Sequence, residues 1–200
     1  MDIVHSAVGK LREMTRGCGY EDGNIVLSVN PDRKVCQFEK GACMEVSFGG
    51  RIAEFVTFEP TRGTTRLPFL FSAALEKPAH RAAACAIINV LTGFMCISRA
   101  RRSCNPGCHA ACMADLRARI GEKAVGGLEI PGHVLRSFPR HTDSPGGGDV
   151  VLVGGEGLLS PEFGSLLEEG GPEKILLVGP STSGIACLES LPHWCPYGEG

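Results

Sequence analysis

Apolar residues in the first third of the chain follow first a helical and then an alternating pattern. The spacing predicts an amphipathic helix over residues 2–15, a strand over 24–29, and two further strands over 43–48 and 51–58. Gly49-Gly50 separates the last two strands and is typical of a two-residue hairpin turn. This part of the chain is therefore predicted to form an antiparallel meander behind one helix.

The middle of the chain changes to helical spacing. We expect helices over residues 67–76, 79–98 and 106–120. The second of these contains 17 uncharged residues, 82–98, which is at the lower limit for a membrane span. Because Asn89 and Thr92 interrupt its apolar character, a buried core helix is the favoured interpretation, and no membrane partner is expected.

Beyond residue 148 short apolar runs alternate with helical segments. Strands are predicted over residues 149–153 and 174–178, and helices over 160–169 and 183–191. Continuous apolar runs of this kind are typical of strands buried on both faces, which occur in parallel sheets covered by helices. The predicted fold class is thus α/β: an α+β N-terminal domain with an antiparallel meander and helices, followed by a small Rossmann-like parallel sheet.

Three segments resemble a known, poorly characterised family. They are the run 148–155, the run 175–182, which ends in the turn Gly179-Pro180-Ser181-Thr182, and the small-residue helix 80–91, which carries Asn89. The family joins an enolase-N-terminal-like domain to a small Rossmann-like domain, and heavy-metal chelation is its suggested role. The resemblance implies an enolase-N-terminal-like α+β domain over residues 1–120 and a short Rossmann-like domain over 121–200.

Composition narrows the class of protein. The 200 residues are 43% hydrophobic and 21% charged, as in ordinary globular proteins. The net charge of −2 gives no positive electrostatic field that would bind nucleic acid. Ten cysteines are unusual, and the start of the sequence shows no secretory signal. We therefore expect a cytoplasmic protein whose thiols are reduced and are buried, catalytic or metal-bound.

Cys104, Cys108 and Cys112 give the strongest chemical signal. Asn105 is a good N-cap and Pro106 suits the first helical position, so Cys108 and Cys112 are expected on one face near a helix start. The positive end of that helix would lower thiol pKa values. Three thiolates there could hold an iron–sulfur cluster or a soft transition metal. Cys96 could supply a fourth ligand, and His109 is a weaker candidate.

Other interpretations of the cysteine pattern stay open. Cysteine often packs as a small hydrophobe, and redox thiol chemistry is a further alternative. We expect Cys85 to be core. For a first scattered set, packing is the favoured interpretation: Cys18, Cys36 and Cys43. A second set gives a weak metal-binding signal: Cys187, His193 and Cys195.

Two glycine-rich loops follow the predicted parallel strands, at 154–157 and 179–184. Such loops form the binding crevice of open α/β sheets. Amides and hydroxyls at Gly179, Pro180, Ser181 and Thr182 could hold a carboxylate or phosphate, so a small anionic ligand or metal chelator is the expected partner. Neither loop has the dinucleotide-binding spacing.

Three basic residues, Arg99, Arg101 and Arg102, are predicted to lie on a solvated helix end, although they could draw an anion toward the thiols.

Three functions follow from these patterns. The first is a metal- or iron–sulfur-cluster-handling protein with a ligand cleft between two domains. The second is an enzyme of small-molecule metabolism that uses the Rossmann crevice. The third is a non-catalytic interaction subunit, because a short parallel sheet could need a partner or a second copy to cover it.

Overall fold

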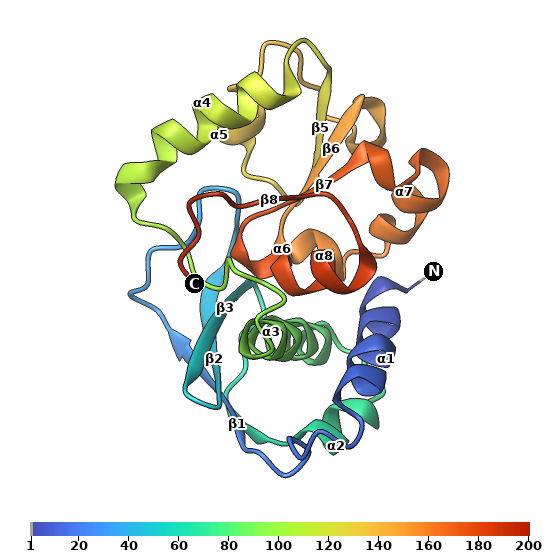
Figure 1. The fold of residues 1–200 in the computed structure, drawn as a ribbon. Coiled ribbons are helices and arrows are strands. Elements are labelled where there is room, and N and C mark those ends of the chain that lie inside the picture. The colour runs from blue at the N-terminus through green and yellow to red at the C-terminus, as the bar shows by residue number, and fades with distance from the viewer. Residues whose placement is uncertain (1) are drawn as a thin grey trace.

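Two four-stranded sheets organise the chain in the computed structural model, which describes residues 2–200 (Figure 1). The helices are α1 (Ile3–Thr15), α2 (Leu67–Phe71), α3 (Pro78–Phe94), α4 (His109–Ile120), α5 (Gly132–Leu135), α6 (Gly155–Leu159), α7 (Glu162–Gly170) and α8 (Ser183–Glu189). The strands are β1 (Ile25–Asn30), β2 (Ala42–Phe48), β3 (Arg51–Thr57), β4 (Gly63–Thr65), β5 (Val125–Leu128), β6 (Val150–Val153), β7 (Ile175–Val178) and β8 (His193–Trp194).

The first sheet is antiparallel, with strand order β3-β2-β1-β4. This confirms the predicted meander and adds β4, which is too short to show a periodic pattern. One face of the sheet buries Met44, Val46 and Phe55 in the main core with α1 and α3. Asp2 caps α1 through its Oδ1, which accepts from the N–H of Val4 at 3.0 Å.

The second sheet is parallel, with strand order β5-β6-β7-β8. Alternate residues of β6 face opposite sides: Val151 and Val153 join the main core with α6 and α8, whereas Leu152 joins a second cluster with α4 and α5. The α/β class predicted from the apolar runs is therefore confirmed. The sequence pattern did not reveal β8, which has only two residues.

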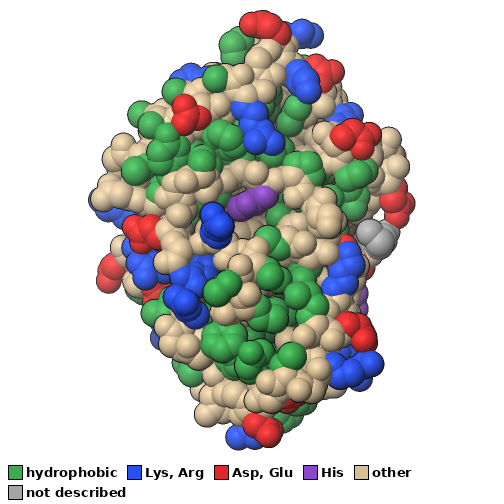
Figure 2. Space-filling view, in the orientation of Figure 1, with side chains coloured by type: hydrophobic (Ala, Val, Ile, Leu, Met, Phe, Trp, Pro, Cys, Tyr) green, Lys and Arg blue, Asp and Glu red, His purple; other side chains and the backbone are tan. Residues whose placement is uncertain are grey.

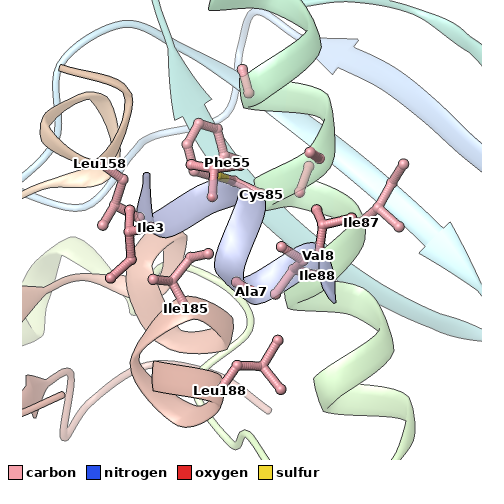
Figure 3. Packing of buried hydrophobic residues seen from close by; sticks show 14 of the residues in the cluster. Ile3, Ala7, Val8, Phe55, Cys85, Ile87, Ile88, Leu158, Ile185 and Leu188 are labelled. Carbon is pink, nitrogen blue, oxygen red and sulfur yellow. The ribbon is translucent and has the colours of Figure 1, made fainter. Parts of the chain in front are cut away.

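A helical layer joins the two sheets. In Figure 1, α3 lies between the antiparallel sheet and the helices α6 and α8. Figure 3 shows side chains of α1, α3 and α8 directed into one cluster: Ile3, Ala7, Val8, Cys85, Ile88, Ile185 and Leu188. Cys85 is fully buried there, as predicted. The main core thus continues across residue 121, and α4 packs on the parallel sheet; the domain boundary between residues 120 and 121 stays a prediction.

Some predicted helices have different ends. The helix expected over 67–76 ends at Phe71, and Leu75 adopts a positive φ of 45° before Pro78 opens α3. The helix expected over 79–98 ends at Phe94, because Cys96 takes a left-handed conformation with φ 60°. Residues 155–157, predicted as a loop, begin helix α6. Across residues 2–200, none of the helices has both the length and the apolar character that crossing a bilayer requires.

Candidate functional site

The loop between β1 and β2 packs against the carboxyl ends of the parallel strands. A side chain at Gly154, just after β6, would come within 3.0 Å of the carbonyl oxygen of Phe38. Lys40 pairs with Glu129, which follows β5, at 3.4 Å. Phe38 and Glu39 are both buried. The β1–β2 loop therefore lines the sheet edge at which open α/β sheets usually bind their ligands.

The turn after β7 forms hydrogen bonds with the β1–β2 loop and with β3. The N–H of Ser181 donates to Glu39 Oε1 at 3.0 Å, and Ser181 Oγ accepts from the N–H of Val56 at 2.9 Å. Gly179 has φ 85°, and a side chain there would come within 2.9 Å of Glu39 Oε1, so both its conformation and its space require glycine. In this turn the amide of Ser181 thus binds a carboxyl oxygen, and that oxygen belongs to Glu39. A small anionic ligand at this turn stays a prediction and would have to displace Glu39.

Asn89, in the segment 80–91 of the family resemblance, contacts the turn that ends the segment 175–182. Its Nδ2 donates to the carbonyl oxygens of Glu54 at 3.1 Å and Ser181 at 2.9 Å, and its Oδ1 accepts from the N–H of Gly184 at 2.9 Å. The side chain is fully buried. One residue of α3 therefore fixes β3 and the start of α8 to one another.

Five of the ten cysteines act electrostatically on one another, and we call them the cysteine site. They come from the β1–β2 loop, from the segment around the start of α4, and from the residues after β8: Cys36, Cys104, Cys108, Cys112 and Cys195. Cys36 and Cys112 belong to one buried cluster, against which Trp194 packs. A negative charge on one of these thiols raises the pKa of another: Cys104 and Cys112 have this effect on Cys195, and Cys108 and Cys112 have it on Cys104.

Burial governs the acidity of this group. It raises the pKa of Cys36, Cys104, Cys112 and Cys195, and the carboxyl group of Glu39 adds to the rise at Cys36 and Cys195. At Cys112, interactions with Trp194 and Gln37 oppose the effect of burial. The lowered pKa values expected from the helix start are therefore wrong for Cys104 and Cys112, because desolvation raises the pKa of both thiols. Burial also raises the pKa of Glu39 to about 8, and Glu39 Oε2 is buried without a hydrogen-bond partner.

The predicted helix start is present with a small shift. Asn105 Oδ1 accepts from the N–H of Gly107 at 2.8 Å, which confirms Asn105 as the cap. Residues 106–108 form a 3-10 turn, and α4 begins at His109, so Cys108 precedes the α-helix instead of being its third residue. His109 Nε2 is buried and has no hydrogen-bond partner.

Cys96 does not join the cysteine site. It is exposed and lines a different cavity, together with Arg99 and Arg101. Cys43 is buried on β2, and Cys18 and Cys187 are exposed. His193 precedes Cys195 by two residues, and its Nε2 lies 2.9 Å from the carbonyl oxygen of Gly179.

Cys36, Cys195 and Glu39 were not among the residues for which a metal role was favoured. Cys195 follows β8 as Gly179 follows β7, so the parallel pairing of these strands brings both to one sheet edge. Recognising strand β8 in the sequence would have placed Cys195 at this sheet edge.

The cysteine site is not a preformed metal centre. Among residues 2–200, no group of three or more His, Cys, Asp or Glu side chains is arranged to hold a metal ion. Cys104 lines a surface cavity of about 380 Å³ that also contains Arg33, Lys34 and Glu199. Solvent and small solutes can therefore reach the site at Cys104, while Cys36 and Cys112 are buried.

Comparison with known proteins supports the fold. The chain matches no family model and no curated protein sequence. Its structure is similar to that of a protein of unknown function from the DUF364 family of Pyrococcus horikoshii, with a TM-score of 0.52 and 11% identity over 90% of this chain and 80% of that chain. At this identity the likeness concerns the fold alone. The two-sheet α/β architecture is thus shared with a protein of unknown function.

Proposed function

We propose that this protein binds a soft metal ion or an iron–sulfur cluster through the cysteine site. The observation that carries the proposal is the electrostatic interaction of five thiols from three separate chain segments, one of which, Cys104, lines a surface cavity. Packing alone explains a cysteine such as Cys85, which lies among apolar side chains in a core. It explains less well why thiols distant in sequence gather at one edge of a sheet.

The donor type fits the proposed metal. Thiolates are the ligands preferred by soft ions and by iron–sulfur clusters. Cys104, Cys108 and Cys112 remain the expected ligands, and Cys36 and Cys195 now replace Cys96 as the residues that could complete the set. Because the thiols are not arranged as a closed ligand shell, binding requires their side chains to turn toward the metal and to lose their protons.

The buried residues Phe38 and Glu39 of the β1–β2 loop disfavour a dinucleotide at this edge. Phe38 and Glu39 lie where the crevice of a Rossmann-type sheet would open. An enzyme that uses this crevice would need the β1–β2 loop to move. The enzyme alternative therefore lacks a specific observation in its favour.

A cadmium titration tests the proposal. Cd²⁺ bound to thiolates absorbs in the near ultraviolet, so reduced protein without oxygen should show this band saturating at a fixed ratio of metal to protein. Cys112→Ser and Cys195→Ser should lower the affinity by about tenfold or more, whereas Cys18→Ser, at an exposed cysteine, should not change it. Absence of the band, or an equal effect of all three substitutions, would contradict the proposal.

A further inference from the structure

A second cavity is lined by arginines and carries no acidic side chain. Its volume is about 420 Å³, and its lining consists of Arg51, Gly93, Cys96, Ser98, Arg99, Arg101 and Gly200. It shares no lining residue with the cavity beside Cys104. On the face seen in Figure 2, basic side chains gather near the position that Figure 1 marks as the C-terminus.

The neighbouring carboxylates are engaged elsewhere. Glu54 Oε1 pairs with Arg33 Nε at 2.7 Å, and Glu199 Oε2 pairs with Arg102 at 2.9 Å. Among the described residues, no side-chain carboxylate lines the cavity or pairs with its three arginines. The positive charge of the cavity is therefore not balanced by acidic side chains of the protein.

Two polar groups in the lining are buried without partners. Arg101 is 9% exposed and its Nε has no hydrogen-bond partner, and Ser98 is 6% exposed with an unpartnered Oγ. Unpaired buried donors are rare in folded proteins, and each calls for a cause such as a bound ligand. Both donors belong to the wall of the same basic cavity.

The fold holds Arg101 in this position. A Cβ on Gly93 would collide with Arg101 Cδ, so the absence of a side chain at Gly93 lets the arginine stem lie against the end of α3. Arg101 Nη1 also reaches the carbonyl oxygen of Gly93 at 3.5 Å. The arginine predicted to lie on a solvated helix end is thus built into the wall of the cavity.

We propose that this cavity binds the phosphate group of a small organic phosphate. Guanidinium groups bind phosphate oxygens through paired hydrogen bonds, and a phosphate monoester carries nearly two negative charges at neutral pH. Three arginines match that charge better than they match a monocarboxylate. The volume suits a small molecule, and the net charge of −2 disfavours a nucleic acid.

Calorimetry at fixed ionic strength tests this site with three probes: inorganic phosphate, phenyl phosphate and acetate. Both phosphates should bind and acetate should not; tighter binding of phenyl phosphate assigns the site to an organic phosphate, and tighter binding of inorganic phosphate assigns it to the free ion. Arg51→Gln and Arg99→Gln, at exposed positions, should each weaken phosphate binding by about tenfold.

Arg12→Gln, an exposed position on α1, is the matched control and should leave binding unchanged. Extending the chain by two residues after Gly200 moves any terminal carboxylate away from the cavity, and phosphate should then bind at least as tightly. The proposal is overturned if neither phosphate binds at millimolar concentration. It is also overturned if the Arg51 and Arg99 variants, shown to be folded by circular dichroism, bind as the unmodified protein does.

Discussion

The main-chain N–H of Ser181 donates to Glu39 Oε1 at 3.0 Å, which joins the β1–β2 loop to the turn after β7. Through this bond a loop of the antiparallel half reaches the carboxyl edge of the parallel sheet. Cys36 lies on the same loop and Cys195 follows the neighbouring strand, and Glu39, when ionised, raises the pKa of both thiols. The contact therefore holds the loop that carries Cys36 as well as joining the two halves.

Glu39 should make stability fall as pH rises. Burial raises the pKa of Glu39 from its ordinary value of 4.5 to about 8 in the folded protein. The unfolded chain releases this proton near pH 4.5 while the folded protein keeps it, so the contribution is fully present below about 4.5 and is lost as pH rises to about 8. Urea unfolding between pH 4 and pH 9 measures it.

Glu39→Gln is the matched variant, because its amide oxygen can still accept from Ser181 and carries no titrating proton. The free energy of unfolding of the variant should lose the part of the pH dependence that comes from Glu39. Identical pH profiles for the two proteins would show that Glu39 titrates normally.

Asn89→Ala should strongly destabilise the fold. The change leaves the buried N–H of Gly184 and the carbonyl oxygen of Ser181 without partners, and it leaves a void between α3 and α8. We expect a loss of about 2–4 kcal/mol in the free energy of unfolding. Asn24→Ala, which removes an exposed contact with Arg66, should cost less than about 0.5 kcal/mol. Similar losses in both variants would contradict the role of Asn89.

Cys108 should react with an alkylating reagent faster than Cys85 at neutral pH. Cys108 is partly exposed at the start of α4, whereas Cys85 is fully buried and its pKa is raised to about 12. Mass spectrometry of labelled, metal-free protein maps the rates. Labelling of Cys85 at a rate equal to or above that of Cys108 would show that the core around α3 opens readily.

Periodicity predicted the long elements well, because their burial depends on spacing within one segment. The helix from Asp2, the meander and the strands β6 and β7 follow from such local patterns. The two-residue strand β8 and the three-residue strand β4 do not, since their pairing partners alone define them. The end of α3 was also missed, because a left-handed residue at Cys96 leaves no mark in apolar spacing.

The candidate site was predicted only in part for the same reason. The spacing of Cys104, Cys108 and Cys112 is visible along one segment, so the sequence indicated them. Cys36 and Cys195 reach the site only because a loop folds over a sheet edge and because β8 pairs with β7. The effect of desolvation on thiol pKa values likewise depends on tertiary packing, and it reversed the prediction made from the helix start.

The most direct test of the metal proposal is the metal content of protein purified without oxygen. Elemental analysis and the absorption spectrum should show a stoichiometric soft metal or iron with sulfide in the unmodified chain. The triple variant Cys104→Ser, Cys108→Ser and Cys112→Ser should lose it while its circular dichroism spectrum is retained. Cys85→Ser should lower the free energy of unfolding by about 1–3 kcal/mol and keep the metal. Unmodified protein without stoichiometric metal, or a triple variant that retains it, would contradict the account.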